Sequence, residues 1–443
     1  MKILKFGGTS VGSPQNMKLV ANLVNDEYRK IVVLSAMSGT TNKLVEIAGK
    51  FYQQQTQEAL QLTENLYKIY REVIKGLYTT EKKKFAALDL VISHFDFIKS
   101  MATGPFSIRE ERAILAQGEL LSTALFQFLL EEMNLDSVLL PALNFMRIDE
   151  NEEPDTKFLQ QELSTTLAKH PHNNLFVTQG YICRNSFGEI DNLKRGGSDY
   201  SASLIGAAVK ATEIQIWTDI DGMHNNDPRI VRNTYPIAGL SFDEAAELAY
   251  FGVKILHPSS VLPAKQKNIP VKLLNTMQPE AKGTTISSLS SGKSIKAVAA
   301  KDGIVAINVK SSRMLLAYGF LRRIFEVFEE YKTPIDMITT SEVAVSLTID
   351  NTKHLSDIIA ELKEFGSVQV DESQTIICLV GDSIEEVPGT TVKIFEALKN
   401  IPLRMISYGG SKNNISLLIS TTDKKRALVA LNEGVFEREP AHA

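Results

Sequence analysis

NLKRGGSDYSA, at residues 192–202, places two cations, two glycines, a serine and a carboxylate in one turn. The glycines let the backbone pass close to a ligand, and Ser198 is expected to cap a helix over residues 200–210. The free N–H groups and the dipole of that helix favour a negative charge. The pattern therefore predicts an anion site for phosphate or carboxylate. An ordinary Gly-Gly turn would explain the glycines and the serine, but not the charges beside them.

A second glycine-rich turn lies at the start of the chain, where the short strand KILKF at residues 2–6 runs into GGTSVGS at residues 7–13. The turn is not a Walker A loop, because Ser13 occupies the position of the lysine, and it lacks the Gly-x-Gly-x-x-Gly of a dinucleotide site. Lys5 precedes the glycines and can act as a point charge over a bound anion. Two such turns indicate two anionic substrates, or two ends of one.

The composition is that of a large soluble protein. The 443 residues are 44% hydrophobic and 23% charged, which predicts two or three domains. Cys183 and Cys378 form neither a metal-spaced pair nor a disulfide framework, which favours a cytoplasmic location. We expect no signal peptide and no membrane span, because no apolar run reaches roughly 18 residues. A net charge of −4 argues against nonspecific nucleic-acid binding.

Short apolar runs alternate with helix-length segments through the first two thirds of the chain. Strands are expected at residues 31–35, 138–140, 175–178, 214–218 and 271–273. The alternation favours an α/β fold with a mostly parallel sheet, helices on both faces, and ligands at the carboxyl ends of the strands.

The region over residues 51–100 departs from this rhythm. It is rich in Gln, Glu, Lys and Leu at helical spacing. We interpret it as a helical insertion, which either covers a site or forms a plain surface hairpin.

The last third of the chain follows the Ser-rich stretch at residues 287–292 and contains an internal repeat. Gly319 and the Ile-Phe-Glu at 324–326 recur about 70 residues later as Gly389 and the Ile-Phe-Glu at 394–396. Each copy has the pattern of a small βαββ unit, which needs a partner to be stable, either the other copy or a second chain. The region carries no catalytic constellation and is typical of a sensor or an assembly platform.

These features together resemble the aspartate kinase family, in which an amino acid kinase domain precedes two ACT domains. The resemblance rests on KFGGTS at 5–10, RGGSD at 195–199 and the tail repeats, and it spans nearly the whole chain. Further matching segments are QGE at 117–119, WTD at 217–219, DPR at 227–229, VKILHP at 253–258 and ITTSEV at 338–343. It implies a three-layer αβα kinase domain over residues 1–290, with the insertion at 51–100. A regulatory region at 300–443 would follow, with ACT domains at about 303–370 and 375–443, separate or interleaved.

The family transfers the γ-phosphoryl group of ATP to the side-chain carboxylate of L-aspartate, giving 4-phospho-L-aspartate for lysine, threonine and methionine biosynthesis. A carboxylate with a pKa near 4 is ionised at pH 7, so no general base is required. The site must instead supply cations where negative charge spreads. The resemblance assigns Lys5 to the transferred phosphoryl group, Lys254 to the ATP phosphates, and Asp199 to orienting the lysines or the phosphate-bound metal.

The resemblance also implies an aspartate site. Arg195 offers a planar fork for a carboxylate, and Glu119 offers a negative charge for the ammonium group. The family match adds Thr41 and Ser198 to this set. Taken by its local sequence alone, Glu119 fits better as an acid at a helix N-terminus after Gly118, and only the family match favours the aspartate site.

For the nucleotide, the resemblance implies contacts from Gly7, Gly8, Thr218, Asp219 and Arg229. His224 stands where the lysine-sensitive type has tyrosine, a departure from the family pattern. No protein metal site is expected, because the calcium-loop spacing after Asp219 is incomplete. The only metal expected is Mg²⁺ carried with ATP.

The ACT resemblance implies that an end-product amino acid, lysine or its competitor threonine, binds the tail and lowers activity. The matching effector positions are Met314, Gly319, Asp336, Ser341 and Glu342. Ala317 departs from a serine of the lysine-inhibited type. The resemblance implies a homodimer through the ACT domains. Two other functions stay open: another amino acid kinase, which should lack the paired tail, and a non-catalytic amino-acid sensor.

Overall fold

The computed structural model describes residues 1–436 apart from 194–195, 253–256, 290–291, 293 and 312–317. The chain forms two compact units. The first comprises Met1–Met223 and Leu256–Ser288, and the second comprises His224–Ile255 and Leu289–Ala443. Residues 224–252, which the sequence groups with the kinase domain, therefore pack within the second unit.

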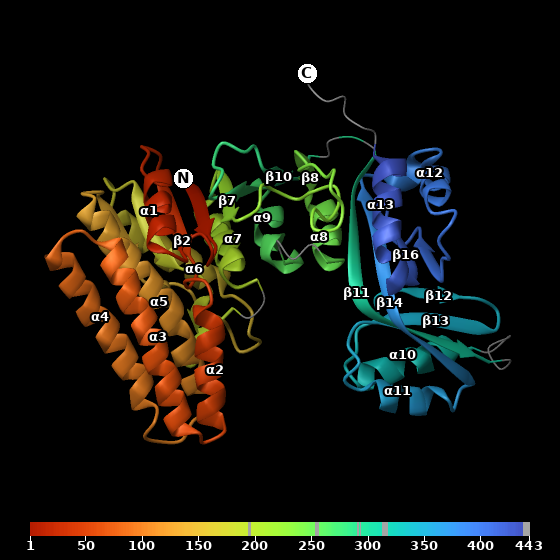
Figure 1. The fold of residues 1–443 in the computed structure, drawn as a ribbon, viewed down its shortest axis with the longest axis horizontal. Coiled ribbons are helices and arrows are strands. Elements are labelled where there is room, and N and C mark those ends of the chain that lie inside the picture. Colours follow the sequence, from red (N-terminus) through yellow and green to blue (C-terminus); the bar gives the residue numbers. More distant parts are fainter. Residues whose placement is uncertain (194–195, 253–256, 290–291, 293, 312–317, 437–443) are drawn as a thin grey trace. The chain divides into compact units, whose positions relative to one another are not determined.

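The first unit is built on a mostly parallel sheet with strand order β3-β4-β2-β1-β7-β9-β10 (Figure 1). The first five strands and β9 run parallel, and β10 is antiparallel to β9. The chain passes from β1 to one neighbour, β2, and later returns on the other side as β7. Such a switch point creates a crevice at the carboxyl ends of the strands. The strands are β1 (Lys2–Phe6), β2 (Lys30–Leu34), β3 (Ser137–Leu140), β4 (Leu175–Gln179), β7 (Glu213–Thr218), β9 (Val271–Asn275) and β10 (Thr284–Ser287).

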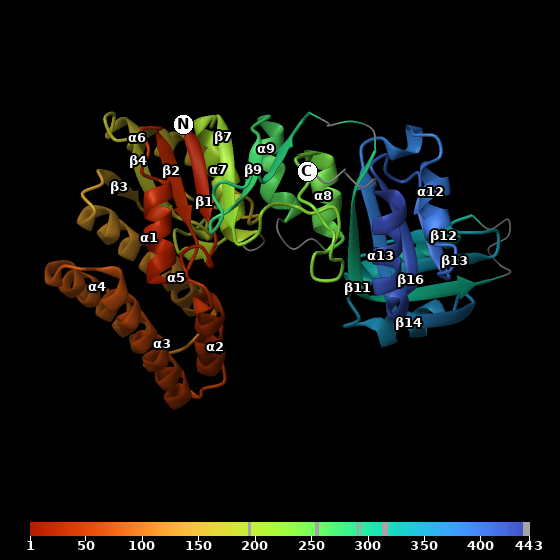
Figure 2. The same cartoon turned by 45° about the horizontal axis from the view of Figure 1, so that its top comes forward.

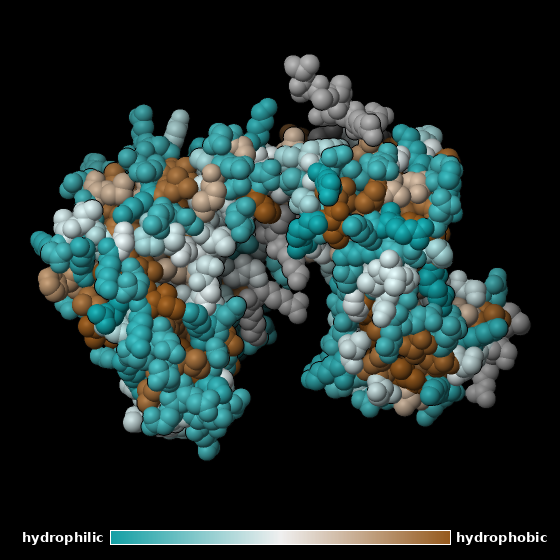
Figure 3. Space-filling view, viewed as in Figure 1, coloured by the Kyte–Doolittle hydropathy of each residue, from teal (hydrophilic) through white to brown (hydrophobic). Residues whose placement is uncertain are grey.

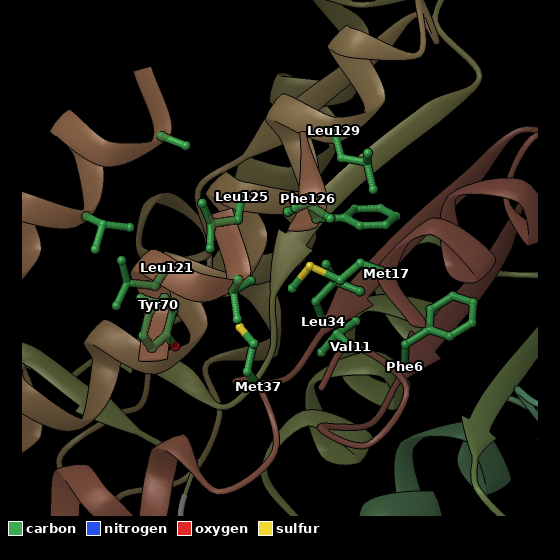
Figure 4. Packing of buried hydrophobic residues seen from close by; sticks show 14 of the residues in the cluster. Phe6, Val11, Met17, Leu34, Met37, Tyr70, Leu121, Leu125, Phe126 and Leu129 are labelled. Carbon is green, nitrogen blue, oxygen red and sulfur yellow. The ribbon is translucent and has the colours of Figure 1, made fainter. Parts of the chain in front are cut away.

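Helices cover both faces of this sheet, as the alternating sequence predicts. Leu4 and Phe6 of β1 point to one face, where they join the apolar cluster of α1 and α5 (Figure 4). Ile3 points to the other face, where Gly206 lets α7 approach closely. The predicted three-layer α/β architecture is confirmed. The covering helices are α1 (Pro14–Leu23), α5 (Ile108–Glu132), α6 (Thr156–Ala168), α7 (Gly197–Val209) and α9 (Leu262–Gln266).

The helical insertion forms a long antiparallel pair, α3 (Thr56–Leu77) and α4 (Glu81–Ser100), packed against α2 (Thr40–Tyr52) and α5 (Figures 1 and 2). Among the described helices, α5 alone is long and apolar enough to cross a membrane, which corrects the expectation that no segment reaches that length. However, 78% of its apolar window is buried, so α5 serves as the core helix of the first unit.

The second unit is built on an antiparallel sheet with strand order β12-β13-β11-β14-β16-β15. The strands are β11 (Ile295–Lys310), β12 (Ile338–Thr340), β13 (Ala344–Ile349), β14 (Ser367–Gly381), β15 (Met405–Tyr408) and β16 (Asn414–Ser420). Helices α10 (Phe320–Glu330), α11 (Leu355–Leu362), α12 (Thr390–Ala397) and α13 (Lys424–Val435) cover it. The short strand β8 (Gly239–Ser241) and α8 (Phe242–Tyr250) also belong to this unit.

The two repeats share strands β11 and β14. The second half of β11 pairs with β13 and with the start of β14, whereas its first half pairs with the end of β14. Each repeat keeps its own apolar core, around Ile307 and Ile324 in the first and around Leu379 and Ile394 in the second. Each also contains a further helix, α11 or α13, which the predicted βαββ pattern did not include.

Candidate active site

Two loops interlock at the carboxyl ends of β1 and β2. The Gly7 N–H donates to the Trp217 carbonyl at the end of β7 (3.1 Å), and the Ser38 N–H donates to the Gly8 carbonyl (3.0 Å). A Cβ at Gly8 would lie 2.9 Å from the Ala36 carbonyl, so only glycine lets the two loops meet without displacement. The predicted phosphate-type turn therefore lies at the switch point of the sheet.

Lys5 and Asp199 form an ion pair beside these loops. The Lys5 Nζ lies 2.7 Å from Asp199 Oδ1, and both side chains are mostly buried. Lys5 is on β1, and Asp199 is in the first turn of α7, so the fold joins the two predicted anion-binding segments. A carboxylate is favoured at a helix N-terminus and fixes the ammonium group beside it.

The start of α7 differs from the prediction. The helix begins at Gly197, with Gly196 as its N-cap at a φ of +70°, and Ser198 lies within the first turn, where its side chain is buried. The predicted Ser198 cap is wrong, because two glycines can adopt the left-handed backbone that ends the preceding loop without a side-chain cap.

A cavity of about 470 Å³ opens between these loops and the helices α2, α5 and α7. It contains four of the predicted site residues: Gly8, Thr41, Glu119 and Ser198. Its lining also includes residues that the sequence did not single out: Thr9, Met37, Gly39 and Tyr181. None of the residues that line it comes from α3 or α4, which contact α2 and α5 instead.

Glu119 is the most informative residue of the cavity. It lies in the fourth turn of α5, not at a helix N-terminus, so the alternative interpretation as a dipole-stabilised acid is wrong. Its Oε1 accepts a hydrogen bond from the Ala36 N–H (3.1 Å), and its Oε2 is buried with no hydrogen-bond partner among the described residues. Burial raises the pKa of Glu119 to about 7. A buried carboxylate oxygen without a donor is suited to an incoming cation.

Gly118 explains why Glu119 reaches the loop after β2. A Cβ at position 118 would lie 2.8 Å from the Cβ of Ala36. The absence of a side chain thus lets α5 press against residues 35–38. Ser122 strengthens this contact by donating to the Ser35 carbonyl (2.7 Å).

Tyr181 is a cavity residue that no sequence motif predicts. It follows β4 and Gly180 with a φ of +65°, an uncommon conformation for a residue with a side chain. Its N–H donates to Ser201 Oγ on α7 (2.9 Å), and its ring lies against Gly197. The local sequence gives no signal for this backbone conformation, because Gly180 beside it is the residue that usually adopts it.

The remaining predicted nucleotide residues are divided between the units. Thr218 ends β7 in the first unit, and its hydroxyl donates to Asp219 Oδ1 (3.0 Å). His224 and Arg229 belong to the second unit. There His224 Nδ1 lies 2.9 Å from Thr234 Oγ1, and Arg229 forms a bidentate pair with Asp227. Lys254 and Arg195 lie outside the described residues.

The predicted effector positions lie in the first repeat of the second unit. Gly319 is the N-cap of α10. The Ser341 N–H donates to the Ala344 carbonyl (2.8 Å), and Glu342 is exposed. Met314 and the departure at Ala317 lie outside the described residues.

Asp336, predicted to face a cationic effector, already has partners within the chain. Its Oδ1 accepts from Tyr250 Oη (2.6 Å) and from Lys301 Nζ (2.8 Å), and its side chain is 1% exposed. Lys301 therefore already forms an ion pair with this carboxylate.

Comparisons with known proteins identify the family. Residues 1–275 match the amino acid kinase family and residues 377–435 match the ACT domain. Lysine-sensitive aspartokinase 3 of Escherichia coli is 31% identical over 98% of this chain and 99% of its own length. The chain belongs to the aspartokinase family. Aspartokinase 2 of Arabidopsis thaliana, a chloroplastic relative, is 32% identical over 99% of this chain and 85% of its own length.

Solved structures give the same result. The crystal structure of E. coli aspartokinase III with aspartate and ADP, described as the R-state, matches with a TM-score of 0.81 at 31% identity. It covers 99% of this chain and all of the other. The T-state of that enzyme, with lysine and aspartate, matches with the same TM-score at 30% identity and the same coverage. Family membership makes this chain an ATP-dependent kinase with two regulatory ACT repeats.

Proposed function

We propose that the cavity beside Lys5 binds L-aspartate and that the chain transfers the γ-phosphoryl group of ATP to its side-chain carboxylate. The observation that carries this proposal is the Oε2 of Glu119, a residue of the cavity lining, which has no hydrogen-bond partner in the part of the chain that the structure describes. An α-ammonium group placed there would satisfy the buried oxygen and would keep Glu119 ionised. Thr41 and Ser198 would contact the carboxylates, and Arg195 would bind one of them bidentately.

Lys5 and Asp199 would act on the phosphoryl group. The acceptor carboxylate is already ionised, so the chemical difficulty is the accumulation of negative charge between two anions. Lys5 would neutralise this charge during transfer, and Asp199, 2.7 Å from its Nζ, would hold the ammonium group in place. Lys254 would bind the ATP phosphates.

The nucleotide would enter as MgATP. Gly7 and Gly8 would bring backbone N–H groups to the phosphates, and Thr218, Asp219, His224 and Arg229 would contact the nucleoside. The described residues contain no group of three side chains suited to hold a metal. Mg²⁺ would keep most of its ligands from phosphate and water, as it usually does, and Asp199, which pairs with Lys5, would help to orient it.

The ACT repeats would bind lysine and lower activity, as the relatives named for lysine suggest, with threonine the alternative effector. Lysine can inhibit only if it binds the less active arrangement more tightly, by about 1–3 kcal/mol in ordinary allosteric couplings. A homodimer through this region would bury the apolar patch over α10 and α11 (Figure 3), where Leu321 and Phe325 are exposed. We place the enzyme in the cytoplasm on the basis of its two free, buried cysteines.

The experiment that tests this function compares acceptors. ADP release from MgATP would be measured with L-aspartate, L-glutamate and N-acetyl-L-aspartate. Release with aspartate alone is expected, because glutamate is one methylene longer and the acetylated analogue has no ammonium group for Glu119. Equal turnover of N-acetyl-L-aspartate would contradict the role of Glu119. Aspartate binding without ADP release would favour the sensor.

A further inference from the structure

A buried ion pair attaches a small hairpin to the helix that carries Glu119. The hairpin consists of β5 (Ile182–Arg184) and β6 (Ile190–Asn192), and β6 lies against α5. Arg112 of α5 forms a close ion pair with Asp191 of β6. The Asp191 side chain is 2% exposed and that of Arg112 is 21% exposed, so this pair is shielded from solvent.

The amino end of the hairpin leads directly into the cavity. Tyr181 precedes β5, and Leu193 follows β6 and donates its N–H to the Tyr181 carbonyl (2.8 Å), which closes the base of the hairpin. Tyr181, Gly197 and Ser198 line the cavity, and the last two come shortly after this base in the chain. The position of the hairpin therefore sets the position of one wall.

The two strands of the hairpin are held by different means. β5 is fixed by backbone hydrogen bonds: Arg184 donates to the Met146 carbonyl (2.9 Å) and accepts from Ile148 (2.8 Å). Across the hairpin, the contacts that tie β6 to α5 include the Arg112–Asp191 pair. Arg112 precedes Glu119 by seven residues, so the two lie on one face of α5 about 10 Å apart along its axis.

The negative charge of Asp191 acts on Tyr181, which lines the cavity. Burial and then neighbouring negative charges, including that of Asp191, raise the pKa of Tyr181 to about 12, whereas the positive charge of Arg112 lowers it. Without Arg112, a buried and uncompensated carboxylate would lie beside a cavity that has to receive further carboxylates. An unpaired buried charge is far more costly than the pair.

We propose that Arg112 and Asp191 are positioning residues for the acceptor: the pair holds the hairpin on α5 and cancels a negative charge next to the aspartate cavity. Neither Arg112 nor Asp191 is among the residues that line the cavity. It sets the affinity for the acceptor through Tyr181 and the start of α7. This inference rests on the proposed function, because it assumes that the cavity takes an amino acid with two carboxylates.

The test compares Arg112→Met with Arg109→Met. Arg109 also joins α5 to the hairpin, through Glu189 at 3.3 Å, but that pair is exposed. Arg112→Met is expected to raise the KM for aspartate at least tenfold and to leave the KM for MgATP within twofold. Arg109→Met should leave both within twofold. Arg112→Lys, which restores a cation, should recover most of the affinity.

Two results would overturn the inference. One is a folded Arg112→Met enzyme with an unchanged KM for aspartate, and the other is an equal loss for both substrates, which indicates general loosening. Should Arg112→Met fail to fold, Asp191→Asn decides, because it removes the charge with little change in size. Because it also removes the negative charge itself, it tests the anchoring role alone: it should raise the KM for aspartate but not for MgATP, and an unchanged KM for aspartate would refute that role.

Calorimetric titration of aspartate separates this inference from the proposed function. Wild-type binding without ADP release would refute the kinase assignment alone. Equal affinities of wild type and Arg112→Met would refute the positioning role alone.

Discussion

The buried carboxyl of Glu119 predicts a specific pH dependence of aspartate binding. Burial raises its pKa to about 7 in the free protein, and its Oε2 lacks a donor among the described residues. The protonated form is neutral and cannot attract an ammonium group, so aspartate binds the ionised form. Affinity for aspartate should therefore increase as the pH rises through 7.

The size of this effect follows from the pKa. Protonation multiplies the apparent dissociation constant by a factor of one plus the ratio of protonated to ionised carboxyl. For a pKa of about 7, this factor is about 11 at pH 6 and about 1.1 at pH 8. The constant should fall about tenfold over this range. Neither the carboxylates nor the α-ammonium group of aspartate titrates appreciably there.

Equilibrium titration with aspartate between pH 6 and pH 8 measures this constant directly. Glu119→Gln should bind weakly and without the inflection. Glu27→Gln is the matched control, because Glu27 is exposed in the turn before β2, at the opposite end of the strands. It should reproduce the wild-type profile. A flat wild-type profile, or an inflection that survives in Glu119→Gln, would refute the reasoning.

Three further predictions follow from the described contacts. Lys5→Met should lower kcat about a hundredfold, which is the usual effect of losing one donor to a developing oxyanion, and should change the KM for aspartate little. Retention of wild-type turnover would refute the catalytic role of Lys5. Because the pKa of Glu119 is raised in the folded state, the ligand-free protein loses stability as the pH rises from about 4.5 through 7. Glu119→Gln should therefore stabilise the ligand-free protein at pH 8, by about 3 kcal/mol at most, and not at pH 4. Thermal unfolding at the two pH values checks this, and an equal Tm shift at both would contradict it. Lys301→Met removes the ammonium group that pairs with Asp336 and should lower the lysine concentration needed for half-inhibition severalfold. An unchanged inhibition curve in the folded variant would show that Lys301 does not compete with the effector.

The sequence predicted the scaffold of the first unit because its signals are local. Apolar runs alternate with helical segments, and the glycines after β1 lie where two loops must interlock. The tail repeat was visible for the same reason. Whether the repeats are separate or interleaved stayed open, because the sharing of β11 and β14 depends on pairing between residues far apart in the sequence, such as Ile307 with Val370, 63 positions later.

The site was only partly predictable. Glu119 follows a glycine, which in sequence reads as a helix start, yet Gly118 is needed inside α5 because Ala36 packs against it. Serine is a residue type typical of an N-cap, but Gly196 adopts the left-handed conformation, so that the helix begins before Ser198. Tyr181 and the Arg112–Asp191 pair depend on tertiary contacts that no short motif encodes.

The most direct test of the proposed reaction is to trap the product. An acyl phosphate reacts with hydroxylamine to give a hydroxamate, so the enzyme would be incubated with MgATP, hydroxylamine and either aspartate or glutamate. The account predicts hydroxamate with aspartate alone and its loss in Lys5→Met. ADP release without hydroxamate, or equal hydroxamate from glutamate, would contradict phosphoryl transfer to the aspartate side chain.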